Sequence, residues 1–319
     1  MARTEGVTIN GVLNLNKPAG ETSMNMVRMV KRLTKEKKVG HGGTLDPLAA
    51  GVLPICFGQA TRLMEPLVDG TKLYRTKIRL GETTDTYDSD GTIVSTADAT
   101  GISRQDIESV LIRFTGLISQ IPPMYSALKQ GGERLYDLAR AGFEVEREAR
   151  SVQVSTIEIV EWELPDLVLD IECGRGVYVR SIGHDLGQAL GCGGHVIDLQ
   201  RRKAGPFRME DGVTPDAFEA AVEKGTWRDL IHAPDTVVQN LPAATVTGAL
   251  ESFVKNGRPV RLGSRETIRQ AQHGDLWRIY TNDGQFLALA RFDKPLGQWK
   301  PEKVFDPGPM VRQKDHVLS

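Results

Sequence analysis

Short runs in which apolar and polar residues alternate recur along this chain, and they constrain its fold more than any other feature. Such runs occupy residues 73–81, 91–96 and 152–164, and their two-residue period predicts strands with one buried face. Apolar residues at helical spacing lie at 23–35 and 103–116. The pattern therefore predicts a protein that mixes strands with helices.

Capping residues support both predicted helices. Thr22 or Ser23 can cap the first helix, and Ser103 precedes the second. Residues 167–180 have the pattern of a strand, a glycine turn and a second strand, and the segment after them is typical of a helix that ends at Gly191. Helices and strands are thus expected to alternate irregularly along the chain.

The last quarter of the chain differs from the rest because its apolar runs are short and turn residues interrupt them. Residues 243–308 predict a small all-β module, and Asp283-Gly284 is a hairpin signal within it. Residues 1–10 and 309–319 are expected to be terminal tails. The 319 residues suit one large domain followed by a small one.

Charge is segregated along the chain although the total is near zero, with 40 Lys and Arg against 41 Asp and Glu. Residues 24–40 carry six basic residues and one acid, and residues 174–208 carry six basic residues and two acids. Residues 82–108 carry seven acids and one arginine. A basic stretch can follow a phosphate backbone, but it is also commonly a solvated helix face. Charge alone does not choose between them.

Composition excludes some cellular environments. No apolar run reaches the ~18 residues of a membrane helix, and the N-terminal residues lack the apolar segment of a secretory signal. The three cysteines, Cys56, Cys173 and Cys192, are few and far apart, which is typical of a reducing compartment. We therefore expect a cytoplasmic protein without a membrane partner.

Common cofactor and nucleophile motifs are missing or incomplete. The sequence has no GxxxxGK[ST] and no GxSxG, and neither of its glycine-dense segments completes GxGxxG. Residues 84–91 begin like a calcium loop, but Ala97 stands where the bidentate acid should be. Cys192 and His195 have the spacing of metal ligands without a second pair. We expect no metal and no cofactor.

The remaining candidate for chemistry is a carboxylate in the glycine-rich segment 42–51. Pro47 biases Asp46 toward an extended backbone, and the glycines allow another chain to approach closely. An Asp-Pro pair is also a common turn element. Taken alone, this loop leaves a catalytic and a structural role open.

Five segments resemble, in order, the motifs of the bacterial tRNA pseudouridine-55 synthases, the TruB family. The catalytic motif is matched by KVGHGGTLDPLAAGVLPICFGQATRL at 38–63. The other matches are NLNKPAGETS (14–23, with Asn16 where an Asp is common), PPMYSALKQGGERLYDLAR (122–140), GRGVYVRSIGHDLG (174–187) and GCGGHVIDLQRR (191–202). Together they span about two thirds of the chain, and their shared order makes the resemblance highly specific.

The resemblance implies an α+β fold. A catalytic domain over residues 11–240 would be built on a mostly antiparallel mixed sheet, with a thumb loop at about 122–150. Residues 243–308 resemble a PUA RNA-binding domain more loosely, and a module that only packs against the rest is the alternative.

Three residues match the family's catalytic positions. The resemblance makes Asp46 the catalytic carboxylate and Arg180 the cation beside it, and a cation within ~4–6 Å lowers a carboxyl pKa that burial raises. Tyr74 matches the active-site tyrosine, which is suited to stacking on an extruded base. A surface ion pair for Arg180 and an ordinary strand aromatic for Tyr74 are the simpler alternatives.

The resemblance also assigns substrate-binding positions to His41, Tyr178, Leu199, Lys17, Lys129 and Arg134. His41 would take the place of the extruded nucleotide or stack with the loop, and Tyr178 would line the pocket. The thumb cations, Lys129 and Arg134, would contact phosphates, as would the two basic stretches. Lys17 and Leu199 match positions that look structural or pocket-lining.

The implied activity is isomerisation of uridine 55 in the T-loop of tRNA to pseudouridine, with base flipping and an essential aspartate. Because reactant and product are isomers, the reaction requires no cofactor. The implied partner is the tRNA T-arm and not DNA, and the enzyme is expected to be a monomer without an obligatory protein partner. Two alternatives stay open: a guide-RNA-dependent synthase for ribosomal RNA, and a non-catalytic tRNA-folding chaperone.

Overall fold

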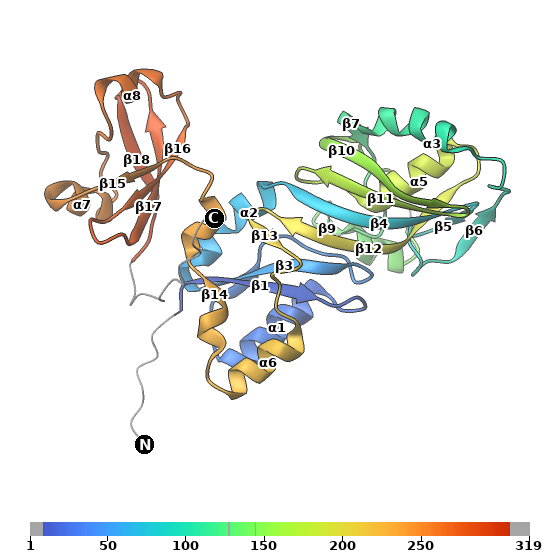
Figure 1. The fold of residues 1–319 in the computed structure, drawn as a ribbon, viewed down its shortest axis with the longest axis horizontal. Helices are drawn as coiled ribbons and strands as arrows, with labels where there is room; N and C mark the ends of the chain where they lie inside the picture. The colour runs from blue at the N-terminus through green and yellow to red at the C-terminus, as the bar shows by residue number, and fades with distance from the viewer. Residues whose placement is uncertain (1–8, 127, 144, 307–319) are drawn as a thin grey trace.

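The protein consists of a large sheet with its covering helices and a smaller C-terminal sheet (Figure 1). The computed structural model describes residues 9–126, 128–143 and 145–306. The expected tail 309–319 and most of the expected tail 1–10 lie outside these ranges. Ile9 is already packed in the main core, with only 3% of its surface exposed.

The large sheet is mixed. Its main strands follow the order β14 (Ile231–His232), β1 (Gly11–Lys17), β3 (Ala50–Phe57), β12 (Gly194–Ala204), β4 (Lys72–Leu80), β11 (Asp166–Cys173), β10 (Arg150–Glu163) and β7 (Gly116–Gln120). Two short strands extend it, β2 (Val39–His41) beside β3 and β13 (Phe207–Arg208) beside β12. Among its described pairs only β3–β12 is parallel, which confirms the expected mostly antiparallel mixed sheet.

Helices cover the sheet and close the main core. The larger part contains α1 (Ser23–Thr34), α2 (Met64–Asp69), α3 (Arg104–Leu111), α4 (Leu135–Arg140), α5 (Val179–Ala189) and α6 (Pro215–Glu223). The short 3₁₀ helices are η1 (Gly58–Leu63), η2 (Ile112–Phe114), η3 (Trp227–Leu230) and η4 (Pro234–Val238). There are also two small two-stranded sheets among the described residues. One pairs β5 (Glu82–Thr84) with β6 (Ile93–Thr96), and the other pairs β8 (Lys129–Gln130) with β9 (Glu133–Arg134). Helices α1 and α6 pack together near β1, whereas α5 lies along β12 and contacts α3 (Figure 1).

The two predicted helix starts are confirmed. The Thr22 side chain accepts a hydrogen bond from the backbone N–H of Asn25, so Thr22 rather than Ser23 is the cap of α1. Ser103 and Asp106 exchange side-chain and backbone bonds in a capping box at the start of α3. Local side-chain chemistry was sufficient to place both starts.

The second strand expected within residues 167–180 is wrong. The chain leaves β11 at Cys173 and enters α5 at Val179. The side-chain amide of Gln120, on β7, bonds both the N–H and the C=O of Tyr178, at 2.8 and 3.0 Å. A distant strand therefore fixes the helix start, and this tertiary contact overrides the strand preference of the β-branched residues there.

The C-terminal region has its own four-stranded sheet, in the order β15 (Ala243–Thr245), β16 (Leu276–Tyr280), β17 (Phe286–Asp293) and β18 (Gln298–Val304). The predicted hairpin joins β16 to β17, and Gly284 takes a φ of 80° in its turn. Two short helices that the turn-rich sequence did not reveal, α7 (Gly248–Lys255) and α8 (Arg265–Gln270), belong to the same module. Trp299, fully buried, is part of its core.

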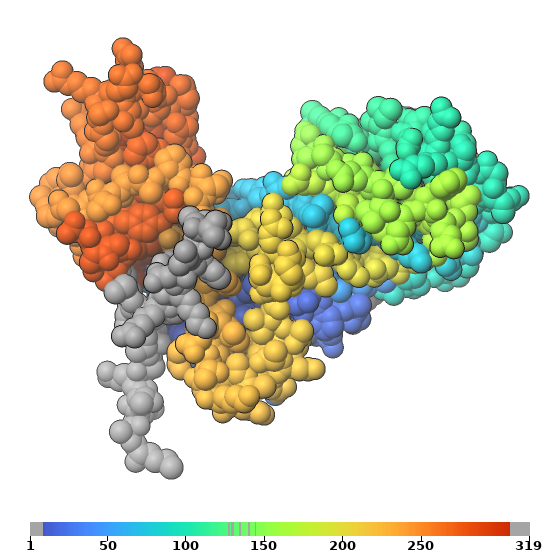
Figure 2. Space-filling view, viewed as in Figure 1, coloured from blue at the N-terminus to red at the C-terminus, as the bar shows by residue number. Residues whose placement is uncertain are grey.

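An apolar cluster joins the two parts. Leu289 and Phe305 of the C-terminal module share it with Leu63 and Leu67 of the η1–α2 segment. The Arg62 guanidinium also donates to the Val304 carbonyl at 2.5 Å. Figure 2 shows the module standing apart from the α3 end of the large sheet, with a hollow between them. Within the described ranges, no helix is both long and apolar enough to cross a bilayer.

Candidate active site

The loop between β2 and β3 carries Asp46, and local contacts fix its shape. The Ser23 hydroxyl, at the start of α1, donates to the Leu45 carbonyl at 3.0 Å and accepts from the Leu45 N–H at 2.9 Å. Gly51 has a φ of 106°, and a Cβ there would lie 2.3 Å from the Arg201 carbonyl oxygen. Only glycine suits this position, so the loop returns to β3 at a point where β12 lies in close contact.

Arg201 holds the inner side of the Asp46 loop. Its side chain is 1% exposed and donates to three backbone carbonyls: Val52 at 2.7 Å, and Thr44 and Gly43 at 3.1 Å each. Three charge-assisted bonds to one loop and the strand after it make this a rigid attachment. Arg201 was expected, as part of the basic stretch 174–208, to contact phosphates. That expectation is wrong for this residue because its guanidinium is used inside the protein.

Lys17 reinforces the same inner side. Its fully buried ammonium donates to the carbonyls of Pro18, Glu21 and Pro47, at 2.8, 2.6 and 3.2 Å. Burial lowers the pKa of Lys17 to about 8, against an opposing contribution from the nearby Asp46 carboxylate. The three bonds use all three ammonium hydrogens, so the structure places Lys17 as a support beneath Asp46.

Arg180, in the first turn of α5, lies at the centre of the site. Its Nε is 2.9 Å from the Asp46 Oδ2, and its Nη1 is 3.0 Å from the Asp88 Oδ2. Nη2 donates to the carbonyl of Tyr125, in the thumb segment, at 2.8 Å. The Arg180 side chain is 4% exposed, whereas that of Asp46 is 31% exposed. The guanidinium is therefore buried between two carboxylates, and one of these reaches the surface.

Asp88 belongs to the candidate site although the sequence did not reveal it. Its carboxylate accepts from the Thr86 hydroxyl at 2.5 Å and from the Asp90 N–H at 3.1 Å. Burial raises the pKa of Asp88, whereas the Thr86 bond and the Arg180 charge oppose the rise. Residues 84–91 were considered only as an incomplete calcium loop. The available signal was the acid-rich stretch 82–108, which can supply a carboxylate to a buried arginine elsewhere in the chain.

Two tyrosines lie near enough to Asp46 for its charge to affect them. Burial raises the pKa of Tyr74 and that of Tyr178, and the Asp46 charge adds to the rise in both. Tyr74 lies on β4 directly opposite Arg201 in the β12 register, and the Arg201 guanidinium opposes the rise for Tyr74. Both residues are half-buried. The expected group of Asp46, Arg180, Tyr74 and Tyr178 is thus brought together.

The other expected site residues lie around this group with different exposures. His41 ends β2, and burial together with the Arg201 charge lowers its pKa. Leu199 is 4% exposed and belongs to the main core. Lys129 and Arg134 pair through their backbones in the β8–β9 ladder, and their side chains lie outside the described part of the structure. Leu199 is therefore a packing residue of the main core.

The basic stretch 24–40 differs from the stretch 174–208 in its exposure. The cations on and after α1 are all exposed: Arg28, Lys31, Arg32, Lys35, Lys37 and Lys38. The N-terminus of α1 touches the Asp46 loop through Ser23. An exposed basic surface therefore begins beside the candidate site.

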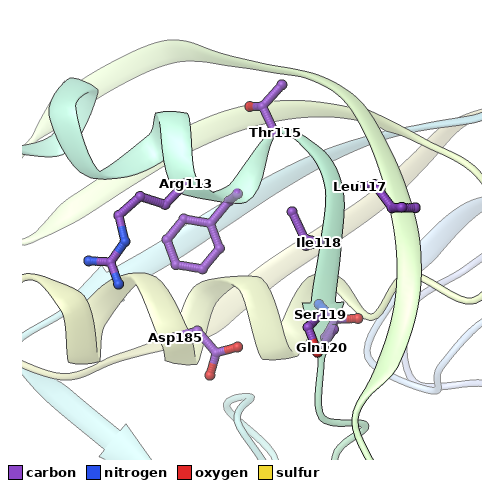
Figure 3. Close-up of a pocket in the computed structure, with 8 residues that line it drawn as sticks. Arg113, Thr115, Leu117, Ile118, Ser119, Gln120 and Asp185 are labelled. Carbon is purple, nitrogen blue, oxygen red and sulfur yellow. The ribbon is translucent and has the colours of Figure 1, made fainter.

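A separate cavity of about 350 Å³ lies between η2, β7 and α5 (Figure 3). In Figure 3 the Arg113 side chain extends toward the helix that carries Asp185, and Ile118 lies between β7 and that helix. Burial raises the pKa of Asp185 to about 6. The cavity contains none of the expected site residues, although its wall includes the Gln120 that fixes the start of α5.

Comparison with known proteins identifies the family. The model "TruB family pseudouridylate synthase (N terminal domain)" matches residues 31–179, and "tRNA pseudouridylate synthase B C-terminal domain" matches residues 180–239. The tRNA pseudouridine synthase B of Dehalococcoides mccartyi is 42% identical over 297 residues, which cover 93% of this chain and 97% of that protein. The protein of that name from Burkholderia mallei is 40% identical with the same coverage.

Solved structures share the fold. One, described as an H/ACA RNP bound to a substrate RNA containing 2'-deoxyuridine, has a TM-score of 0.71 at 27% identity and covers 93% of this chain and 85% of its own. The archaeal box H/ACA sRNP Nop10–Cbf5 complex has a TM-score of 0.68 at 26% identity, with coverages of 94% and 88%. The fold is that of a pseudouridine synthase. This chain belongs to the TruB family.

Proposed function

We propose that this protein is an isomerase that converts uridine to pseudouridine in tRNA, and that its target is uridine 55 in the T-loop. The ion pair between Asp46 and Arg180, 2.9 Å long and formed by residues of two separate family motifs, is the observation that carries the proposal. Relatives at 40% and 42% identity over 93% of the chain are named tRNA pseudouridine synthase B, which supports tRNA as the substrate class.

The reaction exchanges one bond to the ribose for another. The N1–C1′ bond breaks, the uracil turns, a C5–C1′ bond forms, and the hydrogen on C5 is lost while N1 gains one. Asp46 is placed to act on the nucleotide because it is the carboxylate of the site that reaches the surface. Attack on C1′, attack on C6 and removal of a ribose proton are three routes by which a carboxylate can start this exchange.

The uridine must leave its stack before it reaches Asp46, which costs a few kcal/mol. Tyr74 and Tyr178 lie near the carboxylate, and a base stacked on one aromatic ring gains about 1–3 kcal/mol. Stacking of this size offsets most of the extrusion cost. In this proposal His41 contacts the nucleotides around the extruded one, while Lys17 and Leu199 support the pocket without touching RNA.

The RNA footprint extends along exposed cations. The α1 surface begins beside the Asp46 loop, and thumb residues Lys129 and Arg134 would contact phosphates from the other side. The C-terminal module, with ten Lys and Arg against seven Asp and Glu over residues 242–306, would act as a PUA-like RNA-binding domain. These contacts fix orientation, and the shape of the T-loop supplies specificity.

Two alternative functions remain to be separated by experiment. The structural neighbours come from H/ACA particles, one bound to a substrate RNA and one a complex with Nop10, and they represent the guide-RNA-dependent alternative. The much higher identity to proteins named for tRNA favours a stand-alone enzyme, which we expect to be a cytoplasmic monomer. The chaperone alternative predicts tRNA binding without turnover.

Mass-spectrometric mapping of pseudouridine in an unmodified tRNA transcript tests the proposal. Purified protein, without guide RNA or other proteins, should form pseudouridine at position 55. A transcript with cytidine at that position is the matched control and should remain unchanged. Product at another position would refute the site specificity, and no product at all would refute stand-alone catalysis.

A further inference from the structure

The turn that carries Asp88 contains a second contact with α5 that the proposed function does not use. Tyr87, the residue before Asp88, has a φ of 65°, which is strained for a side chain with a Cβ. Its ring stacks on the imidazole of His184, with centroids 3.8 Å apart and planes inclined by 16°. A strained tyrosine is retained where its neighbours hold it in place.

The spacing on both elements makes this a two-point attachment. Tyr87 and Asp88 are consecutive in the turn, while Arg180 and His184 are four residues apart and share one face of α5. Asp88 pairs with Arg180, and Tyr87 stacks on His184. Backbone bonds to Val196 fix the turn against β12. Arg180 meets the turn only through Nη1, which also donates to the Thr86 carbonyl at 3.3 Å, so the guanidinium can still rotate about that atom. The stack adds a second fixed point and sets the orientation.

We propose that Tyr87 and His184 form a positioning pair, whose stacked rings hold Asp88 against Arg180 and thereby orient the guanidinium toward Asp46. Neither ring takes part in the chemical step. The inference rests on the proposed function, because Arg180 must act with Asp46 for the pair to affect catalysis.

The surroundings of His184 favour its neutral form. Burial, with the charge of Arg147, lowers the pKa of His184 from its usual 6.5. Arg147 lies in the segment after α4 and donates to the Pro122 carbonyl at 3.1 Å. The His184 Nδ1 is buried without a hydrogen-bond partner among the described residues. A proton on this ring would place a second cation beside Arg147 in a half-buried site, so protonation, at a pH under 6.5, should destabilise the packing around the pair.

The test replaces the ring of Tyr87 while keeping its backbone. Asn tolerates positive φ, so Tyr87→Asn removes the stack and preserves the turn. In turnover assays on a tRNA transcript, kcat should fall about tenfold or more while KM changes less than about twofold, because geometry and not RNA affinity is lost. Tyr87→Phe is the matched control. The Tyr87 hydroxyl has no described hydrogen bond, so this variant should keep the wild-type kcat.

His184 supplies the independent readout. His184→Phe retains an aromatic ring and should keep the wild-type rate at neutral pH, and it should lose whatever part of an acid decline in kcat arises from protonation of His184, which the lowered pKa puts under pH 6.5. Combining Tyr87→Asn with His184→Ala should lower kcat no further than the more damaging single change. A wild-type kcat in Tyr87→Asn would overturn the proposal that the two rings form a positioning pair. Additive losses of kcat in the double variant would overturn it as well. Inactive wild-type protein would instead refute the proposed function.

Discussion

The two sides of the Asp46 loop are held by buried arginines of different kinds. On the outer side Arg180 is bound by two carboxylates, Asp46 and Asp88. On the inner side Arg201 donates to three neutral carbonyls, and no carboxylate lies within ion-pair distance of it among the described residues. The inner side therefore fixes the geometry of the loop, whereas the outer side sets two carboxylates against one guanidinium. Under the proposed function, Asp46 needs both.

Removing the outer cation should have the largest effect. In Arg180→Met two carboxylates lose their partner, and breaking a buried ion pair in this way costs about 3–5 kcal/mol of unfolding free energy. The rate of pseudouridine formation should fall at least about 100-fold as Asp46 loses its orientation. Denaturant titration and single-turnover assays measure the two effects.

The matched control is Arg175→Met, because Arg175 forms an exposed pair with Asp69. Its stability should change by no more than about 1 kcal/mol. Equal stability losses in both variants would abolish the distinction between a buried and a surface arginine.

Removing the inner cation should have the next largest effect. Arg201→Met removes the donor of three carbonyls, of which that of Val52 is buried, and should lower the unfolding free energy by about 1–3 kcal/mol. The salt dependence of tRNA binding should not change, because Arg201 contacts no phosphate. A shallower salt slope in a filter-binding assay would show instead that Arg201 belongs to the RNA-binding surface.

Neutralising Asp88 should have a smaller effect than removing Arg180. Burial raises the pKa of Asp88 above 3.8, so its charge lowers stability as pH rises from 3.8 toward the folded-state pKa. Because that rise already includes the attraction of Arg180, Asp88→Asn should change the unfolding free energy at neutral pH by no more than about 1 kcal/mol in either direction. The rate should still fall about tenfold, since Arg180 keeps one carboxylate. An unchanged single-turnover rate would show that Asp88 has no part in the proposed reaction.

The smallest effect is expected at Asp185, a carboxylate on α5 that has no described cation partner. Its pKa is raised to about 6 by burial, so the charge lowers stability progressively as pH rises from 3.8 to about 6. Asp185→Asn should therefore increase the unfolding free energy by about 1–2 kcal/mol at neutral pH and not change it below pH 3.8. Thermal melts at both pH values would show this, and a destabilised variant at neutral pH would contradict it.

Much of the fold followed from local sequence, as α1 and α3 illustrate. Thr22 and Ser103 place helix starts through side-chain bonds that span three residues. The start of α5 could not be predicted in this way. Gln120, 58 residues away, sets it, and the local residues Val177 to Arg180 favour a strand.

The candidate site shows the same division. Motif resemblance located Asp46, Arg180 and Tyr74 because each lies within or beside a contiguous segment. It did not locate Asp88, whose partner Arg180 is 92 residues distant. It also grouped Arg201 with RNA-binding cations, because neighbouring arginines in a sequence do not show which side chain points inward. The burial of each arginine side chain distinguishes Arg201 from its neighbours, and that burial depends on the packed fold.

The most direct test of the account compares Asp46→Asn with the wild type in two assays on the same tRNA transcript. Asn keeps the size of the side chain and removes its charge. We expect pseudouridine formation to fall by about 1000-fold or more while tRNA affinity stays close to wild type. Turnover at the wild-type rate would contradict it, because the carboxylate that the two arginines hold in place would then have no part in the reaction.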